Sequence, residues 1–229
     1  MRSVKYYYES SRVKIREFLN PYLGPIRQRL ADATPTGENA SFTIISNNCW
    51  AGHVYRYFNL PYNSPTIGLY FFSDDYIKFI YNIRDYCTKN LEFIDYKQSK
   101  YSAILSQRGG NNITCPIAKL GDIEIVFLHY KTEDEVIKKW HRRCERINWN
   151  KIYYKMTEQN LCTVEHLKLF DELPSNNKFV FVSHDYGLES QVIFKKMLNK
   201  KEVSNDTVYF RRYINLISFI KGLPFKKNQ

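Results

Sequence analysis

Several features that mark membrane, secreted or zinc-binding proteins are missing from this sequence of 229 residues. No apolar run reaches the roughly 18 residues that a membrane-spanning helix needs. The basic N-terminal stretch, MRSVKYYYESSRVKIREFLN, lacks the apolar core of a signal peptide. The five cysteines lie far apart and form no C-x-x-C pair. These absences predict a cytoplasmic protein with free thiols, and they argue against a disulfide framework and a structural zinc site.

Common ligand-binding motifs are missing as well. The sequence has no H-x-x-x-H or H-E-x-x-H pair for a metal, and no G-x-G-x-x-G or G-x-x-x-x-G-K-[ST] loop for a nucleotide phosphate. No metal and no cofactor are therefore predicted, although a nucleotide sugar can bind without either loop. No signature of a nucleic-acid-binding fold is evident, so nucleic acid is not an expected partner.

Positive charge, by contrast, is abundant. Lysine and arginine outnumber the acidic residues by 34 to 23, which gives a net charge of +11. Apolar residues make up 44% of the chain and aromatic residues 16%, which is typical of a globular protein. This charge favours polyanionic partners, which are phosphorylated substrates, nucleic acid or anionic membrane surfaces, and does not choose among them.

The chain divides into a helical N-terminal arm with a linker, residues 1–40, and a single α/β domain, residues 41–229. The arm is helical over residues 3–30 with a break at NPYLGP, and the linker is ADATPTGENA. The arm either packs on the domain or binds a membrane surface or a partner. The same alternatives, packing or docking on an anionic membrane, hold for the aromatic and basic C-terminal segment VYFRRYINLISFIKGLPFKK.

Within the domain, predicted strands alternate with predicted helices. The strands are FTIIS (42–46), a short TIGLYFF (66–72), IEIVFLH (123–129) and KFVFVSH (178–184). The helices span residues 49–58, 73–89, 133–147 and the segment SQVIFKKMLNK. This alternation predicts an α/β fold with a mostly parallel sheet.

Polar residues follow each of the three longer strands. FTIIS leads into Asn47, Asn48 and Cys49, IEIVFL ends at His129, and KFVFVS ends at His184. The carboxyl ends of parallel strands meet at one edge of a sheet, where ligands bind. We therefore expect these residues to face a common cleft.

Cys49 has two interpretations at this edge. A helix N-terminus and a nearby imidazolium both stabilise a thiolate, so Cys49 with His129 or His184 fits an activated nucleophile and its base. Asp185 would orient one of the histidines. The alternative is a small buried thiol that packs at a strand–helix junction.

Two cations are expected near the cleft. Arg56 lies in the helix that Cys49 begins, and Lys131 follows the second of the longer strands. Both side chains would hold an anionic substrate. The basic segment KKWHRRCERINWNK is either a solvated helix face anchored by Trp140 and Trp149, or a patch for phosphate or lipid headgroups.

Three blocks of the sequence resemble a bacterial family labelled exopolysaccharide biosynthesis protein. They are ISNNCWAGHVYRYFNLPYNSPTIGLYFFSDDYIKFI, DIEIVFLHYKTEDEVIKKWHRRCERINWNKIYYKM and LFDELPSNNKFVFVS, and the likeness covers about residues 40–222. The family's signature falls, among others, on Asn47, Asn48, Cys49, Trp50, Thr66, Gly68, His129, Tyr130, Lys131, Trp140 and Arg143. Ala51 stands where the family has a glycine, and no family histidine matches His184.

The resemblance implies an α/β/α layered fold and a cytoplasmic role in making capsule or exopolysaccharide. The expected activity is a transfer reaction on an anionic glycan precursor or from a nucleotide-activated donor. Acyl transfer through a Cys49 thioester, with His129 as base, has the clearest chemical rationale. The residues expected to contact the substrate are Asn47, Asn48, Trp50, Arg56, Thr66, Tyr130 and Lys131.

Two alternatives remain open at this point. One is a glycosyl or phosphoryl-substituent transferase in which cations hold a diphosphate and Cys49 is structural. The other is a non-catalytic assembly or regulatory partner of the polysaccharide machinery, which docks by its basic termini at the inner face of the membrane.

Overall fold

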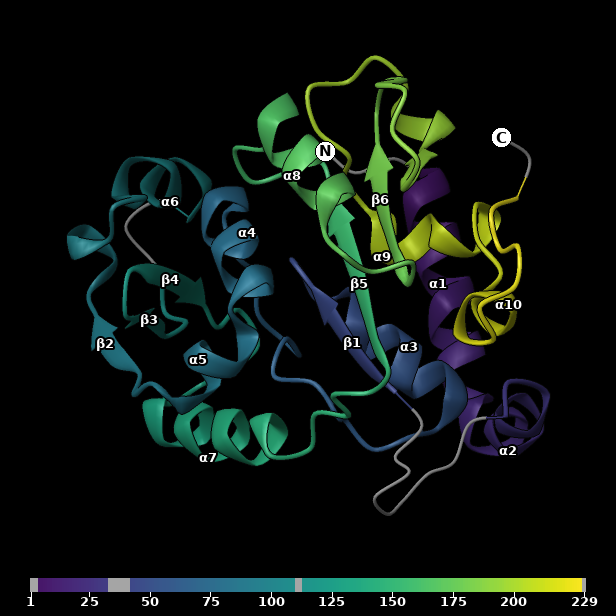
Figure 1. The fold of residues 1–229 in the computed structure, drawn as a ribbon, viewed down its shortest axis with the longest axis horizontal. Helices are drawn as coiled ribbons and strands as arrows, with labels where there is room; N and C mark the ends of the chain where they lie inside the picture. The colour runs from purple at the N-terminus through teal and green to yellow at the C-terminus, as the bar shows by residue number, and fades with distance from the viewer. Residues whose placement is uncertain (1–3, 33–41, 110–112, 228–229) are drawn as a thin grey trace.

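A four-stranded parallel sheet lies at the centre of the fold. Its strands follow the order β1-β5-β6-β7, and every adjacent pair is parallel. The computed structural model describes residues 4–32, 42–109 and 113–227, and Figure 1 shows the sheet beside a smaller one. The bounds of the strands are β1 Thr43–Ser46, β5 Ile152–Thr157, β6 Lys178–Val182 and β7 Gln191–Ile193. The prediction of a mostly parallel sheet is confirmed.

Two of these strands differ from the expectation. Strand β5 was not predicted, and Lys155 interrupts its apolar pattern. Strand β7 and the short 3-10 helix η2 (Lys195–Met197) replace the predicted helix SQVIFKKMLNK. There, pairing with β6 buries Val192 completely, and this tertiary contact overrides the local helical spacing.

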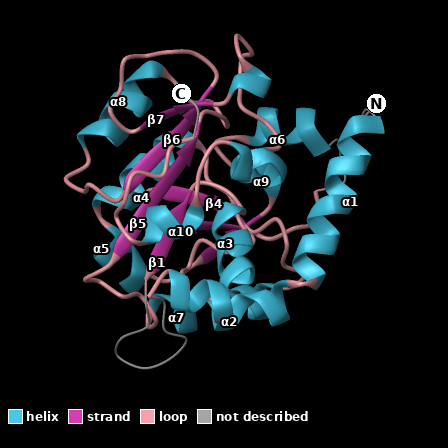
Figure 2. Ribbon diagram, turned by 90° about the vertical axis from the view of Figure 1, so that its right-hand side faces the viewer, coloured by secondary structure: helices cyan, strands magenta, loops and turns pink. Residues whose placement is uncertain are grey.

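Helices cover both faces of the parallel sheet, as Figure 2 shows. Because side chains alternate along a strand, Ile45 and Val180 pack on one face while Ile44 and Phe179 pack on the other. The first face carries α4 (Ser73–Tyr81) and α8 (Val164–Glu172). The second carries α3 (Trp50–Phe58), α9 (Asp206–Tyr209), the 3-10 helix η3 (Phe210–Arg212) and α10 (Leu216–Ile220). The layered α/β/α arrangement is therefore present.

The C-terminal segment packs on the second face of this sheet. The Phe219 ring of α10 lies 4.9 Å from the Tyr153 ring and 5.0 Å from the Phe179 ring, measured between centroids. Of the two alternatives for this segment, packing is the one observed.

A second, antiparallel sheet was not expected. It consists of β2 (Glu92–Ile94), β3 (Ile117–Leu120) and β4 (Ile123–Val126) in that order. The prediction that IEIVFLH joins the parallel sheet is wrong. Gly121, at φ +65°, and Asp122 form a two-residue turn that folds β4 back on β3. His129 consequently lies three residues beyond β4 and does not end a strand.

Three more helices and a short 3-10 helix surround the antiparallel sheet. Their bounds are α5 Ile83–Thr88, η1 Tyr96–Gln98, α6 Ser102–Gly109 and α7 Glu133–Cys144. The predicted helix 73–89 is split at Asn82 into α4 and α5. The predicted strand at TIGLYFF is only a single bridge, between Tyr70 and Val126.

The two sheets share one hydrophobic core. Its buried members include Ile45 of the parallel sheet, Ile125 of the antiparallel sheet, Phe79 of α4 and Trp140 of α7. Helix α4 lies between the sheets in Figure 1 and contacts both α8 and β4. The division at residue 40, with most of the linker, falls outside the described residues, so the predicted domain boundary stays a prediction.

The N-terminal arm forms two helices, α1 (Val4–Phe18) and α2 (Asn20–Leu30), which are separated at Leu19. Helix α2 packs closely on the end of α3, where a Cβ on Gly24 would lie 2.3 Å from the Asn59 Cβ. The side chains of Arg27 and Gln28 donate hydrogen bonds to the carbonyl oxygens of Tyr57 (2.7 Å) and Phe58 (2.6 Å). Among the described residues, no helix combines the length and apolar character that crossing a bilayer requires.

Asn47 fixes the carboxyl ends of β1 and β5 to each other. Its buried side-chain amide donates to the Thr157 carbonyl oxygen (2.9 Å) and accepts from the Thr157 N–H (3.1 Å).

We predict that Asn47→Ala lowers the free energy of unfolding by about 2–4 kcal/mol, because both backbone groups of Thr157 lose their hydrogen-bond partner in a buried place. Urea denaturation measures the change. The control Asn150→Ala, at an exposed position, should stay within about 0.5 kcal/mol; an equally small effect of Asn47→Ala would contradict a structural role.

Candidate functional site

A cavity of about 630 Å³ opens between the parallel and antiparallel sheets. Asn48, Cys49 and Asn160 line it from the parallel sheet, while Arg108 and His129 line it from the other side. A second cavity, of about 420 Å³, shares three lining residues with the first: Cys49, His53 and His129. We call these the large and the small cavity. Cys49 and His129 thus lie where the two cavities meet.

The segment of residues 67–71 connects Cys49 to the antiparallel sheet. The Cys49 thiol lies 3.7 Å from the Leu69 carbonyl oxygen, and the Phe71 N–H donates to the Asn47 carbonyl oxygen (3.1 Å). Residues 67–71 therefore continue alongside the end of β1, although no regular strand forms.

The same segment binds the chain around His129 on its other side. The His129 N–H donates to the Gly68 carbonyl oxygen at 2.9 Å. Gly68 has φ +75°, and a Cβ there would lie only 3.2 Å from the Tyr130 ring, so this close approach requires glycine. The expectation that Cys49 and His129 face a common cleft is met, but through this segment and not through a shared sheet.

Burial determines the protonation states of the Cys49 thiol and the His129 imidazole. Burial raises the pKa of Cys49 to about 11, with the negative charge of Asp206 adding to the effect. Burial lowers the pKa of His129 below its usual value, and electrostatic repulsion from the Arg56 guanidinium adds to the effect. Near neutral pH the thiol is therefore protonated and the imidazole is neutral. A resting thiolate at the start of α3 is not favoured.

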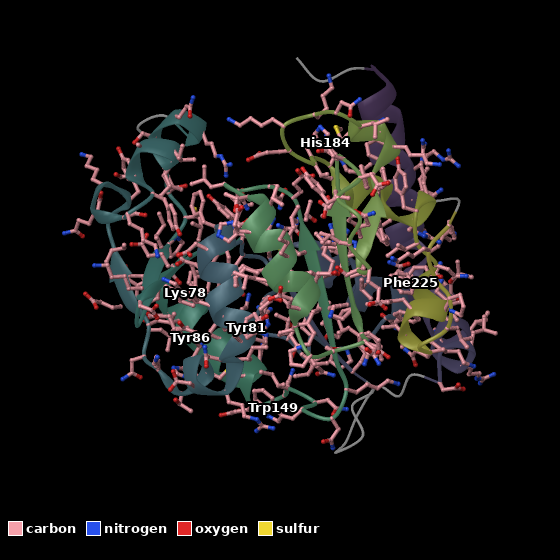
Figure 3. The ribbon with its side chains drawn as sticks, turned by 45° about the horizontal axis from the view of Figure 1, so that its top comes forward. Lys78, Tyr81, Tyr86, Trp149, His184 and Phe225 are labelled. Atoms are coloured by element: carbon pink, nitrogen blue, oxygen red, sulfur yellow. The ribbon has the colours of Figure 1, made fainter. Side chains whose placement is uncertain are left out.

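His184 lies apart from Cys49 and His129. It follows the end of β6, where Figure 3 labels it, and it lines neither cavity. Its ring nitrogen forms a 2.8 Å hydrogen bond with the Ser183 hydroxyl. Asp185 accepts from the Gly187 N–H (3.0 Å) and from Gln191 (2.6 Å), and does not orient either histidine. The structure brings Cys49 together with His129 but not with His184.

The residues expected to contact substrate separate into two groups. Asn48 lines the large cavity, and Arg56 and Tyr130 line the small one. The other four have different surroundings: Asn47, Trp50 and Thr66 are fully buried in structural contacts, and Lys131 lines a separate surface pocket.

A buried ion pair behind Cys49 was missed by the sequence analysis. Lys155 of β5 pairs with Asp206 of α9, and both are buried. Asp206 also accepts hydrogen bonds from Asn48 (3.0 Å) and Thr157 (2.8 Å), while Lys155 donates to the Asn48 side-chain oxygen (2.9 Å). The nitrogen and the oxygen of the Asn48 side-chain amide are therefore both held by hydrogen bonds to this pair. The pair was missed because β5 was not recognised and a lysine and an aspartate far apart in sequence look like surface residues.

Both pKa values of this ion pair are shifted. Although burial acts to raise the pKa of Asp206, the positive charge of Lys155 and several hydrogen bonds hold it below its usual value. Burial lowers the pKa of Lys155, and the charge of Asp206 opposes that shift. Removing one partner would leave an uncompensated buried charge, so the pair must be kept or replaced as a unit.

Arg143 of α7 is also buried, at 5% exposure, and so does not belong to a solvated helix face. Its guanidinium donates to the Tyr130 hydroxyl and to the Ile67 carbonyl oxygen (3.3 Å), and its Nε has no hydrogen-bond partner. Within the described part of the chain, no carboxylate forms an ion pair with it. Among the residues that the structure describes, Arg143 is thus a buried cation that forms no ion pair with a carboxylate.

The residues around Arg143 are also basic. The small cavity is lined by Arg56, Lys139 and Arg143 together with His53 and His129, and no acidic residue is among its described lining. Arg56 pairs with Glu17 and Lys139 with Glu135 outside this lining. Such a cavity is suited to an anion, above all to a phosphate with its several acceptor oxygens.

The large cavity differs in character. Tyr70, Gln159 and Asn160 supply neutral polar groups, and Leu105 and Val126 supply apolar surface. Arg108 also lines it and is held by the Asn160 side-chain oxygen at 2.7 Å. Among the described residues, no group of three or more His, Cys, Asp or Glu side chains is arranged to hold a metal ion.

Comparison with known proteins assigns most of the chain, including the lining of both cavities, to one family. The family described as a domain of unknown function (DUF1919) matches residues 33–221. The chain belongs to this family. An uncharacterised protein of Haemophilus influenzae is similar, with 28% identity over 188 residues, which cover 80% of this chain and 84% of that protein. The DUF1919 match includes every residue that lines the two cavities, whereas α1 and α2 precede it.

The raised pKa of Cys49 in this DUF1919 protein has a measurable consequence. We predict that iodoacetamide alkylates Cys49 slowly at pH 7, and that the rate rises about tenfold per pH unit up to pH 10, because only the thiolate reacts. Peptide mass spectrometry follows Cys49 separately from the other four cysteines, and circular dichroism checks folding at each pH. Fast alkylation with no change between pH 6 and 8 would instead reveal a resting thiolate.

Proposed function

We propose that this protein is a cytoplasmic transferase of capsule or exopolysaccharide synthesis, and that a phosphate-bearing glycan precursor or donor binds in its two cavities. The resemblance of the SNNCWAG, LPYNSPTIGL and FLHYK motifs to exopolysaccharide biosynthesis proteins supports the pathway. The burial of Arg143 without a carboxylate partner, in a cavity whose described lining contains no acidic residue, supports the phosphate.

Arg143 is the observation that carries this proposal. Removing a guanidinium from water without a compensating anion costs several kcal/mol. A phosphate in the small cavity would balance that charge and accept from the free Nε, and the planar guanidinium suits two of its oxygens at once. Lys139, one turn before Arg143 on α7, and Arg56 of α3 also line this cavity and would contact the remaining oxygens.

The large cavity would hold the sugar. Its volume of about 630 Å³ is within the range of small-molecule sites, and its amide and hydroxyl groups are suited to sugar hydroxyls. With phosphate on one side and sugar on the other, the bond that joins them would lie at the junction of the cavities. That junction is lined by Cys49, His53 and His129.

His129 is suited to act as the general base in a direct transfer. Its lowered pKa keeps it neutral near pH 7, so it can take a proton from an attacking hydroxyl of the acceptor. The acceptor oxygen then forms the new bond to the sugar or phosphoryl group, and the bond to the leaving phosphate breaks with its electron pair. In this reaction Cys49 has a structural role.

Acyl transfer through Cys49 is a second candidate, because a protonated thiol and a neutral imidazole line the same cavities. His129 would take the thiol proton while the sulfur attacks an acyl carbonyl, and the donor's leaving group would depart with that proton. A hydroxyl of the glycan would then attack the thioester and release the thiol. The pKa of about 11 makes the first step more demanding than direct transfer.

Binding of phosphates tests the role of Arg143. We predict that pyrophosphate and UDP-glucose bind to the full chain, and that Arg143→Met weakens both by at least tenfold, equivalent to about 1.4 kcal/mol. Isothermal titration calorimetry measures the affinity. The matched control is Arg142→Met, which removes the exposed neighbouring cation and should bind like the wild type. Arg143→Met that binds equally well while folded, or a wild type that binds neither compound, would refute the phosphate site.

Complementation of a deletion strain tests the reaction. We predict that the deletion removes a sugar or substituent from the surface polysaccharide, and that His129→Gln and Arg143→Met restore less than a tenth of it. Restoration by Cys49→Ala indicates direct transfer, while failure of both Cys49→Ala and Cys49→Ser indicates the acyl route. Full restoration by all four variants would point to a non-catalytic partner, and unchanged polysaccharide in the deletion would overturn the proposal. Compositional analysis by mass spectrometry, with immunoblots for protein level, gives the result.

A further inference from the structure

The N-terminal arm exposes large apolar side chains on both of its helices, which we call the apolar stripe. Its seven large side chains are between 38% and 74% exposed. Within α1 two of them lie one turn apart, within α2 the others have the spacing of one helical face, and Leu19 lies between the two helices. The members of this stripe are Ile15, Phe18, Leu19, Tyr22, Leu23, Ile26 and Leu30.

Helix α2 turns large apolar side chains toward solvent, whereas a surface helix usually turns them toward the core. It packs on α3 through Gly24, Arg27 and Gln28, and turns Tyr22 and Ile26 outward. A helix whose only partner is its own domain buries its apolar side. An exposed stripe of this size therefore indicates a further partner with an apolar surface.

The charges on the arm identify the partner's chemistry. Residues 11–30 contain five cations and one acid, Glu17. Arg12, Lys14 and Arg29 are exposed, whereas Glu17 turns toward the domain and pairs with Arg56 at 3.1 Å. An apolar stripe flanked by cations, with an aromatic ring at its centre, is typical of helices that lie in the interface of an anionic bilayer.

We propose that α1 and α2 dock the protein on an anionic lipid bilayer, with the apolar stripe at the boundary between headgroups and acyl chains. The exposed cations would contact the lipid phosphates. A second copy of the chain fits this face less well, because pairing two arms would bring their like charges together.

Docking would also place the candidate site at the membrane. Glu17 of α1 forms a 3.0 Å contact with the His53 ring nitrogen as well as its pair with Arg56, and both partners line the small cavity. The helix that meets the bilayer is thus in direct contact with the site. Docking itself does not depend on the reaction proposed above.

Vesicle flotation with the full chain tests the docking. We expect binding to vesicles of phosphatidylglycerol mixed with phosphatidylcholine at low salt, and at least tenfold weaker binding to phosphatidylcholine alone. The variant Phe18→Ser, Tyr22→Ser, Ile26→Ser should lose at least tenfold in binding. Its control, Leu169→Ser, Leu198→Ser, Leu223→Ser, changes three apolar residues elsewhere that are 41–51% exposed, against 55–74% for the stripe residues, and should bind like the wild type.

A charge variant and a measurement of mass complete the test. Lys14→Gln with Arg29→Gln should weaken binding to the anionic vesicles and reduce its salt dependence. Absence of vesicle binding at every salt concentration would overturn the proposal, as would equal binding to neutral and anionic lipid. Light scattering that shows a dimer, which the stripe variant converts to a folded monomer without vesicle binding, would assign the stripe to self-association. Loss of phosphate binding in Arg143→Met has no bearing on flotation, so the two proposals fail separately.

Discussion

The hydrogen bonds of residues 68–71 determine the geometry of the candidate site. On one side Phe71 bonds to Asn47, and on the other His129 bonds to Gly68. These contacts hold the end of the parallel sheet against the antiparallel sheet and leave the two cavities between them. Because Gly68 approaches the Tyr130 ring so closely, a larger residue there would push the two halves of the site apart.

Two buried cations near this site have opposite surroundings. Lys155 is paired with Asp206 and bonded to Asn48, so its charge is used to fix the structure behind Cys49. Arg143 has hydrogen bonds but no carboxylate among the described residues. Since an unbalanced buried charge is costly, the first cation has a structural role, and the second is the basis of our proposal that a phosphate binds there. The N-terminal arm adds exposed cations on the outer surface. Its Glu17 contacts His53 and Arg56, which belong to the same site.

Part of the site could be predicted because its residues follow one another in the chain. Asn48 and Cys49 directly follow β1, so the pattern of an apolar strand with a polar end was enough to find them. His129 was predicted to lie near Cys49 because it was expected to end a strand of the parallel sheet. The strand before it, β4, belongs to the antiparallel sheet instead. His184 follows a strand of the correct sheet, yet it lies outside both cavities. The order of the strands decides which strand ends lie beside the cavities. That order depends on pairing between residues far apart in the chain, so the local sequence says little about it.

The sequence by itself determined the α/β class, the strands β1 and β6, the helices α3 and α7, and the excess of positive charge. These depend on local periodicity, capping and composition. Only the tertiary structure decided that β5 lies beside β1, that Lys155 meets Asp206, that Arg143 is buried without an acid, and that the arm turns its apolar side outward. The physical reason is the same in each case: burial and charge balance are properties of neighbours in space, and a residue's neighbours in sequence do not specify them.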